Sequence, residues 1–154
     1  MVETRILLNR VTRIIAYTRF PFVDQENWPD DRCTIVNDET KRFGIKWEKG
    51  VLYPNIVILD GEGSVREFGL VEPKEAINEQ SIPKWRTMSE VAPYGRKFKK
   101  LFFYVPNGYE EALLKLLEEN EIEFDGIRGY QIESGGLKVI PFITKNDDYD
   151  HQVT

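Results

Sequence analysis

Residues 51–74, VLYPNIVILDGEGSVREFGLVEPK, decide the fold that we predict for this chain of 154 residues. The unbroken apolar run at 56–59 is typical of a strand that is buried on both faces and is therefore central in a sheet. The Asp-Gly-Glu-Gly sequence that follows it predicts a tight turn. We therefore expect two antiparallel strands, at 51–59 and 64–72. Pro73 ends the second strand because proline has no N–H for the ladder.

Hydrophobic periodicity places further elements on both sides of this pair. A strand at 43–48 precedes it, so the three strands form a meander. The other predicted elements are helices at 2–18, 81–92 and 109–120, a strand at 100–105, and a hairpin with arms at 127–132 and 137–143. Segment 20–34 contains two prolines and is predicted to be a long surface loop. The predicted fold class is α+β. Its mixed central sheet is built from the meander, a helix and a fourth strand and is flanked by helices, with an added helix and a C-terminal hairpin.

The composition is that of an ordinary soluble globular domain, with 41% apolar and 31% charged residues. We expect a single domain at 1–144 and a polar, disordered tail at 145–154. No stretch approaches the roughly 18 apolar residues that a membrane span needs. We therefore expect a cytoplasmic protein without a membrane partner.

The chain has one histidine, His151, and one cysteine, Cys33. These counts exclude zinc fingers, Ser-His-Asp relays and disulfide scaffolds. Any catalysis must depend on carboxylates, lysine, arginine, tyrosine or a metal ion that is bound mainly by oxygen, such as Mg²⁺.

Two short motifs lie on the predicted meander: Pro54-Asn55 on its second strand and Glu72-Pro73-Lys74 at the end of its third. With the order helix, three strands, helix, strand over residues 1–105, they resemble the PD-(D/E)xK nuclease superfamily, which has the restriction-endonuclease-like fold. In that family the second strand carries Pro-Asp and the third carries an acid, any residue, then lysine. The carboxylates hold Mg²⁺ against a scissile phosphate.

The resemblance implies a site in which Asn55 and Glu72 hold the metal while Glu72 and Lys74 are catalytic. Residues two apart on a strand point to the same face, so Glu72 and Lys74 would converge on one phosphate. Asn55 stands where the family has aspartate, and a neutral amide binds Mg²⁺ less well than a carboxylate. The expected cofactor is therefore Mg²⁺ if the site is active, and none if it is not.

Two alternatives to this site stay open. The tripeptide Glu72-Pro73-Lys74 is by itself typical of a solvated strand end that leads into a turn. In a second alignment, Leu70 takes the place of the acid and Glu72 that of the lysine, which removes the catalytic apparatus. Lys84 on the following helix would then supply the missing charge.

One compact basic run interleaves with aromatic residues at 94–100. Its cations, Arg96, Lys97, Lys99 and Lys100, are candidate phosphate contacts in a chain whose net charge is −5. The alternative is a charged loop that Phe98 anchors to the core.

These features support two hypotheses about function. The first is a nuclease-like protein that resembles Mg²⁺-dependent nucleic-acid phosphodiesterases and has an eroded site; whether it is an enzyme is left open. The second is a non-catalytic protein on the same fold that binds nucleic acid or forms a homodimer. A third reading is an unrelated α/β domain with the same strand order.

Overall fold

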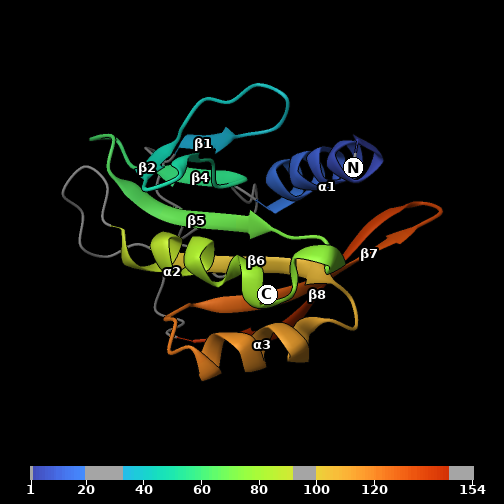
Figure 1. Ribbon diagram of the computed structural model, residues 1–154. Coiled ribbons are helices and arrows are strands. Elements are labelled where there is room, and N and C mark those ends of the chain that lie inside the picture. The colour runs from blue at the N-terminus through green and yellow to red at the C-terminus, as the bar shows by residue number, and fades with distance from the viewer. Residues whose placement is uncertain (1, 20–32, 92–99, 146–154) are drawn as a thin grey trace.

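The computed structural model describes residues 2–19, 33–91 and 100–145. Its centre is a six-stranded mixed sheet in the order β1-β4-β5-β6-β7-β8 (Figure 1). The strands are β1 (Cys33–Val36), β4 (Ile56–Leu59), β5 (Val65–Val71), β6 (Lys100–Pro106), β7 (Gly126–Glu133) and β8 (Gly136–Thr144). Strands β5, β6 and β7 run parallel to one another, and the other pairs are antiparallel. The carboxyl ends of three parallel strands therefore meet at one edge of the sheet.

Helices cover both faces of this sheet. Helix α1 (Val2–Arg19) packs Val11 and Ile15 against one face, where they meet Phe102 and Tyr104 of β6. The connections from β5 to β6 and from β6 to β7 run through the helices of the other face, α2 (Ile82–Glu90) and α3 (Glu110–Glu119). Two short 3₁₀ turns, η1 (Lys74–Ala76) and η2 (Glu79–Ser81), join β5 to α2. Both apolar faces of the sheet are thus buried, as its almost continuous apolar strands require.

The predicted helices, the fourth strand and the C-terminal hairpin are confirmed, within a few residues at their ends. The two strands of the opening motif are antiparallel neighbours, with Ile56 opposite Gly69. No helix in the part of the chain that the structure describes is long and apolar enough to cross a membrane. The tail predicted to be disordered lies, after Lys145, outside the described residues.

The predicted first strand of the meander is wrong. Segment 43–48 does not join the main sheet, because β2 (Ile45–Trp47) and β3 (Gly50–Leu52) form a separate two-stranded hairpin. The place beside β4 is taken by β1, which begins inside the segment predicted as a loop. The predicted strand at 51–59 is also two strands, β3 and β4, since Pro54 between them cannot donate a ladder hydrogen bond.

The side chain of Asn37 stabilises this arrangement of β1, the β2–β3 hairpin and β4. It is buried directly after β1, and its Nδ2 donates to the carbonyl oxygens of Phe43 (2.8 Å) and Pro54 (2.6 Å). Its Oδ1 accepts from the main-chain N–H groups of Arg42 (2.7 Å) and Phe43 (3.1 Å). The Asn37 amide therefore fixes both the loop that leads to the hairpin and the irregular segment at Pro54, before β4 begins.

We expect Asn37→Ala to lower the free energy of unfolding by about 3 kcal/mol, because it leaves several buried main-chain groups without partners. Urea denaturation measures this value. The control Asn107→Ala, at an exposed asparagine, should change it by less than about 0.5 kcal/mol. A loss at Asn37 as small as that of the control would contradict the assignment.

Arg13 joins α1 to the loop after Asn37 through ion pairs with Asp38 (3.3 Å) and Glu39 (2.8 Å). The pKa of Asp38 is lowered, first by a hydrogen bond from the main chain of Thr40 and then by Arg13. The pKa of Glu39 is lowered by its own main-chain N–H and by Arg13. Both carboxylates therefore stabilise the fold above their unfolded pKa values, near about pH 4, and this contribution is lost as pH falls through the lowered values.

We accordingly expect the urea midpoint to fall on acidification below about pH 4, and part of that fall to disappear in Arg13→Gln. Urea titrations across the acid range measure both. Parallel pH profiles for the two proteins would show that the ion pairs contribute nothing to acid sensitivity.

Candidate functional site

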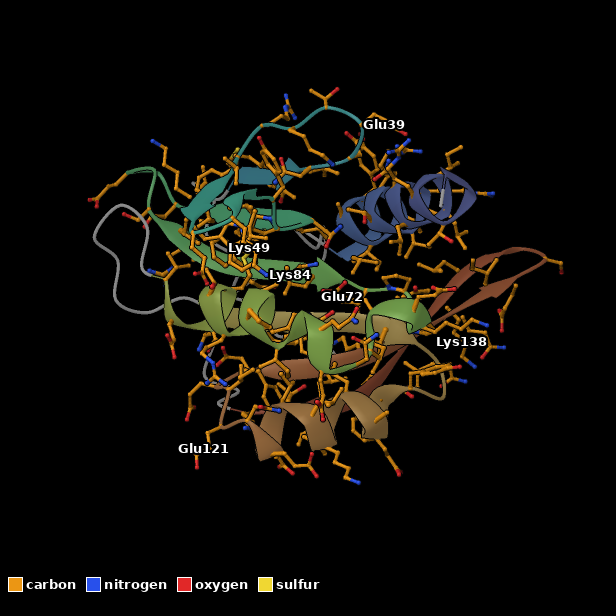
Figure 2. The ribbon with its side chains drawn as sticks, viewed as in Figure 1. Glu39, Lys49, Glu72, Lys84, Glu121 and Lys138 are labelled. Atoms are coloured by element: carbon orange, nitrogen blue, oxygen red, sulfur yellow. The ribbon has the colours of Figure 1, made fainter. Side chains whose placement is uncertain are left out.

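Glu72 is a buried acid at the carboxyl end of β5. It is 2% exposed. Its Oε2 accepts a hydrogen bond from Trp85 Nε1 at 2.7 Å and lies 3.0 Å from Lys84 Nζ (Figure 2). Its main chain continues the sheet, since its N–H donates to the carbonyl of Tyr104. A carboxylate is thus fixed at the edge where the parallel strands end.

The local sequence of α2 brings Lys84 to this carboxylate. Pro83 lies in the first turn, and the buried stripe of Ile82, Trp85 and Met88 packs the helix on the sheet. Lys84 is next to that stripe, with a side chain that is 33% exposed. Its stem therefore runs along the helix while its ammonium group closes the site from the solvent side.

Both contacts of Glu72 fall on the same oxygen. No described residue donates a hydrogen bond to Oε1. The arrangement therefore places a carboxylate oxygen that has no donor among the described residues beside one ammonium group.

Asn55 does not present its amide oxygen to Glu72. Its Oδ1 accepts a hydrogen bond from the main-chain N–H of Val71 at 2.8 Å. The residue thereby extends the pairing between β4 and β5 by one position, up to Pro54. Among the described residues, no group of three or more histidine, cysteine, aspartate or glutamate side chains is placed to hold a metal ion. The amide oxygen expected to bind Mg²⁺ thus already accepts one hydrogen bond within the sheet.

Lys74 lies apart from the Glu72 carboxylate. It is exposed in η1 and lines a groove of about 500 Å³ with Leu7 and Leu8 of α1 and Gln131 of β7. No hydrogen bond or ion pair joins it to Glu72 in the described part of the chain. The cation beside the carboxylate is instead Lys84, the residue of the alternative alignment.

Tyr130 is a member of the site that the sequence does not reveal. Its hydroxyl donates to the main-chain oxygen of Glu72 at 3.1 Å. Its pKa is raised, chiefly by burial and also by the charges of Glu72 and Glu75. The phenol thus remains a hydrogen-bond donor and does not act as a base near neutral pH. The sequence predicts that Tyr130 lies on a strand, but it does not predict the contact with Glu72, because the two residues are 58 positions apart.

The predicted basic run falls mostly outside the described residues. Arg96, Lys97 and Lys99 lie there, and their role as phosphate contacts stays a prediction. Lys100 begins β6 and is half-buried opposite Glu67.

Comparisons of the chain with protein families, with characterised proteins and with solved structures found no match.

Lys84→Met should lower the free energy of unfolding by about 1–2 kcal/mol, because it leaves a buried carboxylate without its cation, while the partial exposure of the lysine limits the loss. In a Glu72→Gln background the same change should cost less than about 0.5 kcal/mol, since a neutral amide needs no counterion. Urea denaturation of the four proteins measures this cycle. Lys115→Met, at an exposed lysine of α3, is the matched control, and equal losses in both backgrounds would contradict the pairing.

Proposed function

We propose that this chain is a nucleic-acid-binding protein on a nuclease-like core, in which the metal-dependent phosphodiesterase site has eroded. The observation that carries the proposal is the buried Glu72–Lys84 pair at the carboxyl end of β5. The order of the helices and main-sheet strands supports it once the separate β2–β3 hairpin is left aside, because α1, β1, β4, β5, α2, β6 is a helix, three strands, a helix and a strand. The replacement of segment 43–48 by β1 leaves that order unchanged.

Phosphodiester cleavage needs three things: a cation to stabilise developing negative charge, a water in line with the leaving group, and a group to orient that water. The Lys84 ammonium group is suited to hold a phosphate oxygen or orient a water. The residues present do not fit Mg²⁺, because the metal favours carboxylate oxygens. Asn55 offers only a neutral amide oxygen, which already accepts a hydrogen bond from the Val71 N–H. The proposed activity is therefore binding of a phosphodiester with little or no hydrolysis.

The test begins with labelled DNA oligonucleotides and Mg²⁺, for which we expect no detectable cleavage by the unmodified protein. Asn55→Asp should strengthen Mg²⁺ binding about tenfold, since one carboxylate oxygen can still accept from Val71 while the other adds a negative charge near Glu72. Isothermal titration calorimetry measures this gain. Glu72→Ala in the same background should remove it.

Asn107→Asp is the control for the added charge, because Asn107 is exposed beyond the carboxyl end of β6. It should leave Mg²⁺ binding unchanged. A robust Mg²⁺-dependent cleavage by the unmodified protein would overturn the proposal of an eroded site. An unchanged Mg²⁺ affinity in Asn55→Asp would show that Glu72 and residue 55 do not form a metal site.

A further inference from the structure

The β2–β3 hairpin has one face in the core and one face in solvent. Ile45 and Leu52 are opposite each other in the register and pack into the core cluster that contains Trp85 of α2. Alternation along the strands therefore turns the next pair, Lys46 and Val51, outward, and both are exposed. The outer face of the hairpin is thus available to a partner.

An aromatic ring lies on this outer face, at Tyr53, which is 40% exposed. The ring crosses the main chain at Gly44. A Cβ atom at that position would clash with Val51 and would lie only 2.9 Å from Tyr53 Cε1. The absence of a side chain at Gly44 therefore lets Tyr53 and Val51 lie close against the backbone, where they form an apolar patch.

Basic residues are frequent in the segment that carries this surface. Segment 41–53 holds four of them, Lys41, Arg42, Lys46 and Lys49, and a single acid, Glu48. The Lys41 ammonium group lies over the Tyr53 ring, 5.9 Å from its centroid, and donates to the main-chain oxygen of Asp38.

The positive charge of this segment is not neutralised by its neighbours. Within the described residues, none of Arg42, Lys46 and Lys49 forms an ion pair. The two acids that precede the segment, Asp38 and Glu39, pair with Arg13. The surface is therefore locally basic in a chain whose net charge is −5.

We propose that the outer face of the β2–β3 hairpin binds single-stranded nucleic acid. An unpaired base displaces the Lys41 ammonium group from the Tyr53 ring and stacks there, and Lys41 and Lys46 contact the phosphates on either side. An aromatic ring among cations is the arrangement that single-strand binding uses, because every base has a π face and every nucleotide carries a negative charge. A duplex hides its base faces and would use only the charges. The ligand class is that of the proposed function, but this surface does not require the Glu72 site.

The experiment is fluorescence anisotropy in EDTA with a labelled single-stranded oligothymidine of about 20 nucleotides and a duplex of equal length. Single-stranded DNA should bind more tightly than duplex. Tyr53→Ala should weaken single-strand binding about tenfold, whereas Tyr53→Phe, which keeps the ring, should retain it. With about four phosphate contacts, the logarithm of the binding constant should fall with the logarithm of salt with a slope of about −3, and Lys41→Glu/Lys46→Glu should roughly halve that slope.

Two exposed residues elsewhere provide matched controls: Tyr17 on α1, which is 81% exposed, and Lys115 on α3, whose side chain is 75% exposed. Tyr17→Ala and Lys115→Glu should leave binding unchanged, and circular dichroism of every variant checks its fold. Unchanged binding in the hairpin variants, or loss confined to Lys97→Glu/Lys99→Glu, would overturn the proposal. So would hairpin-dependent binding to phosphatidylserine vesicles without binding to the oligonucleotide. Because EDTA removes metal, a failure here leaves the Mg²⁺ test of Glu72 unaffected, and the converse also holds.

Discussion

The interruption of strand pairing at Pro54 is the constraint on which much of this structure depends. Proline cannot donate a ladder hydrogen bond, so the pairing that β4 would continue ends there. Two asparagines replace the missing contacts. Asn37 binds the carbonyl oxygens of Pro54 and Asn55, through its side chain and its main-chain N–H respectively, and Asn55 accepts from Val71. Both carbonyl oxygens at this interruption are therefore hydrogen-bonded, as buried main-chain groups require.

The chain differs on the two sides of Pro54: the segment before it leaves the main sheet, and the segment after it belongs to the sheet. Before it, the hairpin leaves the main sheet, packs one face on the core and exposes the other, which carries Tyr53 and Lys46. After it, the Asn55 side chain accepts a hydrogen bond from the main-chain N–H of Val71 and joins the ladder between β4 and β5. The interruption at Pro54 therefore separates the hairpin from the main sheet on one side and places the Asn55 amide in the ladder on the other.

Elements with a long and regular period could be predicted from the sequence. Helix α3 has ten residues, β7 has eight and β8 has nine. Each is long enough for its apolar residues to show a regular period, and clear turn signals separate them. Strand β1 could not be found this way. It has only four residues, none of them fully buried, and its place beside β4 is fixed by Asn37 through contacts that reach residues 42, 43, 54 and 55. Hydrophobic periodicity within a short segment cannot predict contacts between residues that are distant in sequence.

The candidate site was predictable as a motif but not as a geometry. Glu72 was identified from its position at the end of a strand, and the structure buries it there. The identity of its cation depends on the path of the chain through η1 and η2, which carries Lys74 into the groove beside α1 and returns Lys84 to the carboxylate. A spacing of two residues implies convergence only if the strand continues, and Pro73 ends it.

The indole of Trp85 explains why this carboxylate is held so firmly. Trp85 is fully buried and packs edge-on against Phe103, with ring centroids 5.6 Å apart. Its N–H would be unsatisfied in the core without Glu72, at a cost of about 1–3 kcal/mol. The acid therefore has a structural duty that is independent of any metal. A cation that approached Oε2 would have to compete with both the indole and Lys84 for the same oxygen. The carboxylate of Glu72 is therefore required by the packing of Trp85 and by Lys84, whether or not a ligand binds there.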